Sequence, residues 1–151
     1  MKIEYKLIHP KISVVMAVYN GERHLREAID SILNQTFADF EFVIIDDAST
    51  DRSGRILQEY AGKDKRIVII GNETNMGLSK SLNKGIRLTK GEYIARMDAD
   101  DISFPDRFEK QVKFLDDHND IGILGTHYLQ MDIGGKDSRE IFASPGQNDI
   151  F

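Results

Sequence analysis

YIARMDADD, residues 93–101, is the stretch around which the rest of the chain is arranged. A short apolar run ends abruptly in three carboxylates within four positions, Asp98, Asp100 and Asp101. If the run is a β-strand, it delivers Asp98 and Asp100 together at the strand's carboxyl end. Carboxylates at this spacing repel one another, so a hard divalent cation is a natural guest. The stretch therefore predicts a strand that leads into a metal-binding loop.

Further apolar runs alternate with amphipathic segments along the chain. Continuous apolar, β-branched runs predict strands over 12–18, 40–45, 66–70 and 92–97, and a fifth over 121–131. A Gly134-Gly135 hairpin turn is expected to lead into a short strand near 139–142. Apolar residues at helical spacing predict four helices. The first covers 22–35, and the second is capped by Thr50 or Asp51. The third has Leu78, Leu82 and Ile86 on one apolar face, and the fourth is capped by Ser103 with Phe108, Val112 and Leu115 on its core face.

Strands that alternate with helices predict an α/β fold with a mostly parallel, doubly wound sheet between two helix layers. Ligands bind such sheets beyond the carboxyl ends of the strands. Three of the first four predicted strands end in polar residues, at Tyr19-Asn20, Asp46-Asp47 and Asp98-Ala99-Asp100. These three groups are therefore expected to share one edge of the sheet. Residues 1–11 are expected to be a leader and 12–151 the domain.

Composition narrows the function classes. The 151 residues are 40% hydrophobic and 30% charged, which suits a globular domain, and the net charge of -5 argues against a nucleic-acid partner. The absence of Cys excludes disulfides and thiolate chemistry, and the four His residues show no metal-ligand spacing. No signal peptide or run long enough to cross a bilayer is visible.

Several motifs can be weighed from the residues alone. Tyr19 either ends a strand or offers a face on which a nucleobase stacks, and Asp47 either caps a turn or accepts hydrogen bonds from a base or ribose. The loop at Gly77 fits neither a P-loop nor a dinucleotide-binding fingerprint. An EF-hand is excluded because Ser103 stands where its loop needs Gly. Lys80 is either a solvated helix charge or a phosphate contact.

Blocks along the chain resemble those of family 2 glycosyltransferases. They are ISVVMAVYN (12–20), SILNQTF (31–37), IIDDASTD (44–51), NMGLS (75–79), NKG (83–85), DADD (98–101) and PDR (105–107), and they cover about residues 11–124. The resemblance implies a GT-A fold and inverting transfer of a sugar from a nucleotide-diphosphate donor, most simply a UDP-sugar, to a glycan or lipid-linked acceptor. It also implies a Mn²⁺ or Mg²⁺ cofactor at a DxD motif and a part in polysaccharide assembly.

The resemblance also implies a role for individual residues. Ala17 and Tyr19 would line the base and ribose pocket, and Asp47 would hydrogen-bond a uracil-like base. Asp98 would meet the ribose or donor sugar, and Asp100 would ligate the metal that bridges the phosphates. The complete predicted nucleotide-sugar site is Ala17, Tyr19, Glu22, Asp47, Gly77, Lys80, Asp98 and Asp100.

The sequence departs from the family pattern at two positions. Ala17 replaces the usual Pro, and Leu82 replaces a basic residue before Asn83, for which Lys80 is the substitute. The family's catalytic base is expected downstream of Phe151. We therefore expect this chain to bind the sugar donor but not to transfer the sugar. A non-catalytic nucleotide-sugar-binding module is the alternative. A dehalogenase-like phosphatase is disfavoured, since Ile102 stands where that motif needs Thr.

The place of the protein in the cell is an expectation of the resemblance only. The expected location is cytoplasmic, with a peripheral position of the full-length protein at the inner face of the membrane as one option. A homo-oligomer is another open option.

Overall fold

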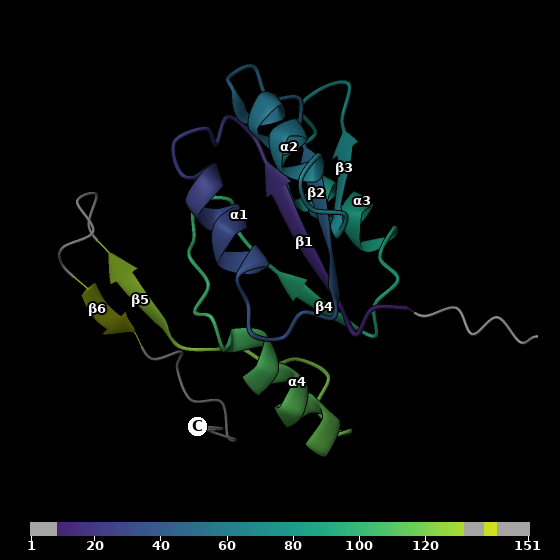
Figure 1. Cartoon of the computed structure of the whole chain (residues 1–151), viewed down its shortest axis with the longest axis vertical. Helices are drawn as coiled ribbons and strands as arrows, with labels where there is room; N and C mark the ends of the chain where they lie inside the picture. Colours follow the sequence, from purple (N-terminus) through teal and green to yellow (C-terminus); the bar gives the residue numbers. More distant parts are fainter. Residues whose placement is uncertain (1–8, 132–137, 142–151) are drawn as a thin grey trace, which may run out of the picture. The chain divides into compact units, whose positions relative to one another are not determined.

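The computed structural model describes residues 9–131 and 138–141 (Figure 1). The chain divides after Val112 into two compact units, and each is described by itself.

The first unit is built on a four-stranded parallel sheet. Its strands are β1 (Ile12–Val18), β2 (Phe40–Asp46), β3 (Ile67–Gly71) and β4 (Tyr93–Arg96), in the order β3-β2-β1-β4. The chain adds β2 and β3 on one side of β1 and then returns to add β4 on the other side, where Val15 pairs with Arg96. This reversal between β1 and β4 is the topological switch point at which doubly wound sheets bind ligands.

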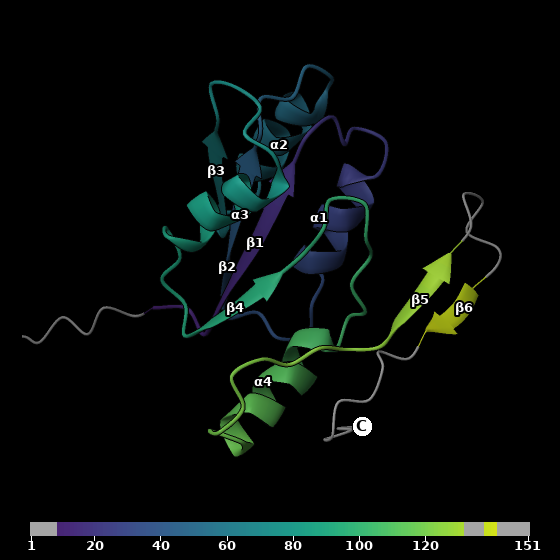
Figure 2. The same ribbon diagram turned by 180° about the vertical axis from the view of Figure 1, so that it is seen from behind.

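Helices cover both faces of the sheet. α1 (Leu25–Leu33) and α2 (Ser53–Ala61) lie on one face, and α3 (Leu78–Ile86) lies on the other (Figures 1 and 2). The three-layer α/β/α arrangement predicted from the sequence is therefore confirmed.

The core explains why β1 and β2 read as continuous apolar runs. Their side chains are buried on both sides, in contrast to β4, whose Ile94 is 50% exposed at the sheet edge. α1 buries Leu25, Ala28, Ile29 and Ile32, as its spacing predicts. At the start of α4 (Arg107–Asp117), Phe108 packs edge-on against Phe40 at 5.7 Å.

The predicted buried face of α3 is wrong. Leu78 and Ile86 are 53% and 40% exposed, whereas Ser81 and Gly85 are buried against the sheet. A Cβ on Gly85 would lie only 2.7 Å from Cγ1 of Val15, so this helix approaches the sheet more closely than any larger side chain permits. Close approach of the backbone, not apolar periodicity, decided which face of α3 points inward.

Two predicted helix starts also need correction. The first helix begins at Leu25 and not at 22, because residues 20–22 bond to the loop that precedes α2. The last predicted helix begins at Arg107, and Ser103 does not cap it. The N–H of Ser103 donates to Ser31 Oγ, and the hydroxyl oxygen of Ser103 accepts from the Gln35 amide. Long-range contacts thus replaced the local capping that the sequence suggested.

In the second unit, the fifth strand is shorter than predicted and lies outside the parallel sheet. β5 covers only Tyr128–Met131 and pairs antiparallel with β6 (Ser138–Ile141), as the predicted hairpin requires. The Gly134-Gly135 turn itself lies outside the described residues. Residues 121–127 form no regular structure: two glycines interrupt them, and Ile123 is 92% exposed.

Candidate functional site

The carboxyl ends of β1, β2 and β4 meet at one edge of the sheet. The ladder continues past the strands, since Asp47 N–H donates to Val18 O at 2.8 Å and Met97 N–H donates to Val15 O at 3.0 Å. A Cβ built on Gly21 would lie 3.8 Å from Cβ of Ala99. The loop that carries Asp98 and Asp100 therefore lies against the loop that follows β1, as the shared-edge prediction requires.

A cavity of about 310 Å³ opens at this edge. We call it the Tyr19 cavity, and it is lined by Ala17, Val18, Tyr19, Asp47, Asn75, Gly77 and Leu78. Tyr19 is 52% exposed, so its ring is open to a flat ligand. The lining is largely apolar with a carboxylate at its base, the usual composition of a pocket for a small organic ligand.

Asp47 is buried and already accepts three hydrogen bonds from the protein. Only 2% of it is exposed, and its carboxylate accepts the N–H groups of Met76 and Gly77, both at 2.8 Å, and the Asn72 amide at 2.7 Å. Burial alone would raise the pKa of Asp47. The hydrogen bonds from Met76, Asn72, Ser81 and Gly77 outweigh it, and the pKa lies below its ordinary value. Asp47 therefore stays ionised and shapes the 72–77 loop.

A second polar layer supports this carboxylate. The Asn72 amide also donates to Ser81 Oγ at 2.9 Å, and its carbonyl oxygen accepts from Lys84 Nζ at 2.7 Å. Lys84 reaches Gly71 O as well, at 3.2 Å. Gly77 takes a φ of 86°, which favours glycine at the turn into α3. The far wall of the Tyr19 cavity is thus fixed from two elements, β3 and α3.

The acidic loop after β4 has a different character. The guanidinium group of Arg96 donates to both carboxylate oxygens of Asp98 at 2.9–3.0 Å, and this ion pair is solvent-exposed. Burial raises the pKa of Asp101, and the charges of Asp98 and Asp100 raise it further. Asp100 is exposed and makes no side-chain hydrogen bond or ion pair with the part of the chain that the structure describes. These carboxylates therefore repel one another, and the charges of Arg107 and Arg96 offset only part of that repulsion at Asp101.

Among the described residues, no group of three or more His, Cys, Asp or Glu side chains is placed to hold a metal ion. A cation here would need ligands from elsewhere. Carboxylate oxygens are nonetheless the donors that Mg²⁺ and Mn²⁺ prefer, and Mg²⁺ is commonly held by one or two carboxylates together with water and substrate phosphate. The chemistry of the loop fits that arrangement.

Gln35, at the end of α1, fastens the acidic loop to the core. It is 6% exposed, and its amide nitrogen donates to Ser31 O, Ser103 Oγ and Phe104 O at 2.7–3.2 Å. Its oxygen accepts the N–H of Phe108 at 3.1 Å. Both ends of this amide are hydrogen-bonded, and the side chain fixes where the acidic loop ends. Sequence reasoning quoted Gln35 within a family block but assigned it no role.

A loop–loop network, formed by residues 20–22 and 49–53, was also missed. Asn20 Oδ1 accepts the N–H groups of Thr50 and Asp51, at 2.8 and 3.3 Å, while Asp51 accepts the N–H groups of Glu22 and Ser53, at 3.0 and 2.8 Å. Asn20 and Ala48 both adopt positive φ, 52° and 60°. The network sets the positions of both loops that flank the cavity.

The predicted site residues separate into four groups. Ala17, Tyr19, Asp47 and Gly77 line one cavity, and Asp98 and Asp100 follow β4 at the same sheet edge. Lys80 is exposed in the first turn of α3. Glu22 does not line the Tyr19 cavity: its carboxylate accepts the N–H of Arg52 at 2.9 Å within the loop–loop network. Ligand contacts by all eight residues stay predictions.

Comparison with known proteins gives this arrangement a family. The model of glycosyl transferase family 2 matches residues 13–148. The putative glycosyltransferase EpsE of Bacillus subtilis is 46% identical over 136 residues, 89% of this chain and 49% of that protein. An uncharacterized glycosyltransferase of Methanocaldococcus jannaschii is 44% identical over 87% of this chain and 46% of its own length. The chain thus spans about half the length of these relatives.

Solved structures agree with the sequence match. Staphylococcus aureus TarS 1–349, solved in complex with UDP, is 31% identical with a TM-score of 0.67, over 72% of this chain and 33% of that one. The mannosyltransferase PcManGT of Pyrobaculum calidifontis, in complex with GDP-Man and Mn²⁺, is 25% identical with a TM-score of 0.65, over 72% and 33%. The sheet, its switch point and these matches agree: the chain has the GT-A type of α/β fold and belongs to glycosyl transferase family 2.

Proposed function

We propose that this chain is the donor-binding part of an inverting glycosyltransferase that uses a UDP-sugar, a divalent metal and a glycan or lipid-linked acceptor. The observation that carries the proposal is that the Tyr19 cavity and the acidic loop lie at the same carboxyl edge of the sheet, where β1 and β4 form its switch point. The aromatic face and the buried carboxylate suit a base, and the exposed carboxylates suit a ribose or sugar and a metal-bound diphosphate.

The relatives support a nucleotide-sugar ligand. TarS has been solved with UDP and with UDP-GlcNAc, and PcManGT with GDP-Man. In this chain, Tyr19 would stack on the base, with Ala17 beside it. Asp47 would meet the base through the oxygen capacity that its three protein donors leave, and Gly77 would line the wall of the site. The choice of a uridine nucleotide is part of the proposal.

The metal is proposed at Asp100, with Asp98 facing the ribose or sugar. PcManGT was solved with Mn²⁺, and the carboxylates after β4 are the donor type that Mn²⁺ and Mg²⁺ bind. Bound there, the ion would offset negative charge on the leaving diphosphate. Lys80, at the start of α3, would supply a further positive charge toward the phosphates.

Thermal unfolding with UDP tests the donor site. We expect UDP to raise the melting temperature only with Mn²⁺ or Mg²⁺ present, and Asp100→Ala to remove the metal-dependent part, because ligand binding to the native state adds stability. Asp117→Ala, an exposed acid at the end of α4, is the matched control and should keep the full response. Equal stabilisation by UDP in EDTA would rule out the metal bridge.

Sugar transfer tests the second part of the proposal, that 12–151 is a donor-binding domain whose general base lies elsewhere. An inverting transferase needs a base for the acceptor hydroxyl. We therefore expect the 151-residue chain to bind UDP and metal without transferring sugar. Turnover to a defined acceptor would overturn the base assignment, while binding without turnover is the behaviour also expected of a non-catalytic nucleotide-sugar-binding module.

The proposal also includes a cellular location for the protein. Within the described residues, no helix is long and apolar enough to cross a membrane. A cytoplasmic location, peripheral to the inner face of a membrane, would suit a lipid-linked acceptor. Fractionation of the full-length protein would test this, and recovery outside the cytoplasm would contradict it.

A further inference from the structure

A second cavity, of about 600 Å³, opens between α1 and α2. We call it the arginine cavity, and it is lined by Glu22, Arg23, Arg26, Arg52, Arg55, Ile56 and Glu59. It shares no lining residue with the Tyr19 cavity, whose wall is completed by the turn into α3 on the other face of the sheet. Its four arginines and two glutamates carry a formal charge of +2, in a chain whose net charge is -5.

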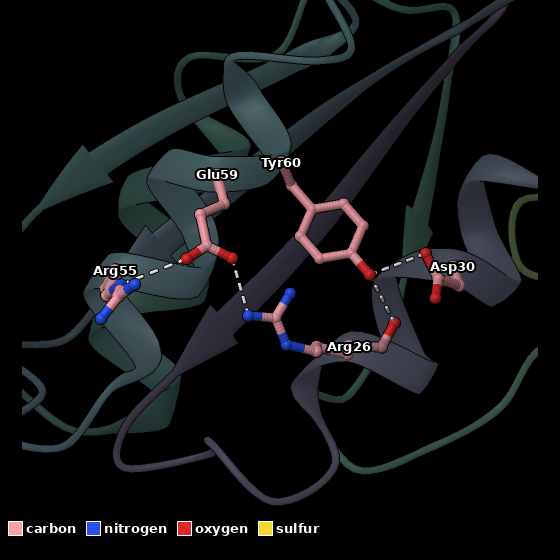
Figure 3. A network of polar contacts seen from close by, with 5 residues as sticks. All are labelled: Arg26, Asp30, Arg55, Glu59 and Tyr60. Carbon is pink, nitrogen blue, oxygen red and sulfur yellow. Dashed lines mark hydrogen bonds and ion pairs between the residues drawn. The ribbon is translucent and has the colours of Figure 1, made fainter.

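Two of the four arginines are held in place. Glu59 Oε2 accepts from Arg26 Nη2 at 2.7 Å and Oε1 accepts from Arg55 Nε at 3.2 Å, so one carboxylate links α1 to α2 (Figure 3). Tyr60 strengthens the same link by donating to Asp30 Oδ1 at 2.8 Å. This network sets the spacing of the two walls before any ligand arrives.

The other two arginines have no such partner. Within residues 9–131 and 138–141, the guanidinium groups of Arg23 and Arg52 make no hydrogen bond or ion pair, and both side chains line the cavity. The hydrogen bond between Glu22 and Arg52 goes to the backbone N–H of Arg52 and does not engage its guanidinium group. Two guanidinium groups are therefore available for an external anion.

The positions of these arginines make an anion more favourable still. Arg23 precedes α1, Arg52 is the N-cap of α2, and Arg55 lies in its first turn. Cations near a helix amino terminus oppose the helix dipole. α2 has no acidic residue within its first turn, and the carboxylates at its start, Asp51 and Glu22, bond the backbone N–H groups of Ser53 and Arg52. An anion bound between the two helix starts would relieve this repulsion.

We propose that the arginine cavity binds a phosphate-bearing anion, with Arg23 and Arg52 as its main contacts and Arg26 and Arg55 as the fixed wall. Arginine suits this ligand because its planar fork donates two parallel hydrogen bonds to phosphate oxygens. The cavity is much larger than one phosphate group, so the phosphate can belong to a small phosphorylated molecule or to a lipid headgroup. The site is separate from the proposed donor site and does not depend on it.

Pyrophosphate in EDTA is the probe for a free anion, followed by backbone amide signals in two-dimensional NMR. The chelator removes the metal-dependent binding expected at Asp100. We expect the largest shifts around Arg23 and Arg52. Arg23→Gln with Arg52→Gln should weaken binding about tenfold or more, because two charge-assisted contacts are lost. Neither side chain has a hydrogen-bond or ion-pair partner among the described residues, so folding should be preserved.

Lys65→Gln with Arg87→Gln is the matched control. It removes the same charge from exposed positions outside the arginine cavity and should leave the affinity nearly unchanged. Flotation with vesicles of phosphatidylglycerol and phosphatidylcholine, against pure phosphatidylcholine, tests the lipid source. Binding in either assay that needs Arg23 and Arg52 supports the site and identifies the source. Equal loss in both double variants, or no binding in either assay, would overturn it.

Discussion

Asp47 and the acidic loop at 98–101 lie at the same sheet edge but differ in how their negative charge is compensated. Asp47 is 2% exposed and accepts from three donors of its own chain, which lower its pKa. Asp101 has a raised pKa, caused by burial and by the charges of Asp98 and Asp100. A carboxylate that is hydrogen-bonded by its own chain stabilises the structure around a site. Carboxylates that repel one another are the ones whose repulsion a bound cation would reduce.

The largest expected effect separates the two regions by stability. Asp47→Ala leaves the N–H groups of Met76 and Gly77 and the Asn72 amide without their acceptor, and should cost about 3 kcal/mol. Asp100→Ala, at an exposed position, should change stability by less than about 0.5 kcal/mol. Urea denaturation of both variants provides the measurement. Similar losses would show that the contrast between the regions is wrong.

Gln35 tests whether the exposed carboxylates depend on buried support. Gln35→Ala removes four hydrogen bonds, three of them to residues 103–108 beyond the acidic loop, and should cost about 2 kcal/mol. It should also weaken metal-dependent UDP binding in protein that remains folded. Asn34→Ala, at the exposed neighbour, is the control and should alter neither quantity. Unchanged UDP binding in folded Gln35→Ala would show that the loop holds its position alone.

Acid titration should show opposite signs for the two regions. Because the pKa of Asp47 is lowered by folding, its stabilisation is present above the unfolded value of about 3.9 and is lost as pH falls through the folded value. Because the pKa of Asp101 is raised, its ionised form penalises folding above the folded pKa, and acidification through that value relieves the penalty. Urea unfolding of Asp47→Asn and Asp101→Asn between neutral and acid pH measures both.

The two variants should change the pH dependence of stability in opposite directions. Asp47→Asn should flatten the loss of stability at low pH, and Asp101→Asn should steepen it slightly. At neutral pH without metal, Asp101→Asn should gain only about 0.3 kcal/mol, since the group is largely exposed and screened. Parallel pH curves for both variants would contradict the comparison.

A last, small effect concerns the residue next to Asp47. Ala48, the next residue, holds a φ of 60°, which costs an L-residue about 1 kcal/mol. Ala48→Gly should relieve that strain and stabilise the protein by about 0.5 kcal/mol after the entropy of glycine in the unfolded chain is counted. Ala38→Gly, where φ is not positive, should destabilise instead. Thermal unfolding distinguishes the two, and a loss at both positions would contradict the strain.

The sequence alone determined the layers, the parallel sheet and the edge at which the site lies. Buried strands such as 12–18 leave a continuous apolar run, and helices such as α1 leave a 3.6-residue period, so local pattern carries this information. Strands of one parallel sheet end at a common edge, so polar residues after β1, β2 and β4 could be brought together without coordinates. The family resemblance then supplied the nucleotide sugar.

Only the tertiary structure decided how each polar residue is used. Asp47 and Asp98 look alike in sequence, yet one is enclosed by the 72–77 loop and the other pairs with Arg96 in solvent. The inward face of α3 depended on Gly85 meeting Val15, and the arginine cavity on two helices separated by a strand. Such contacts join residues distant in the chain, and their energies depend on burial and on hydrogen-bond partners that no local pattern encodes.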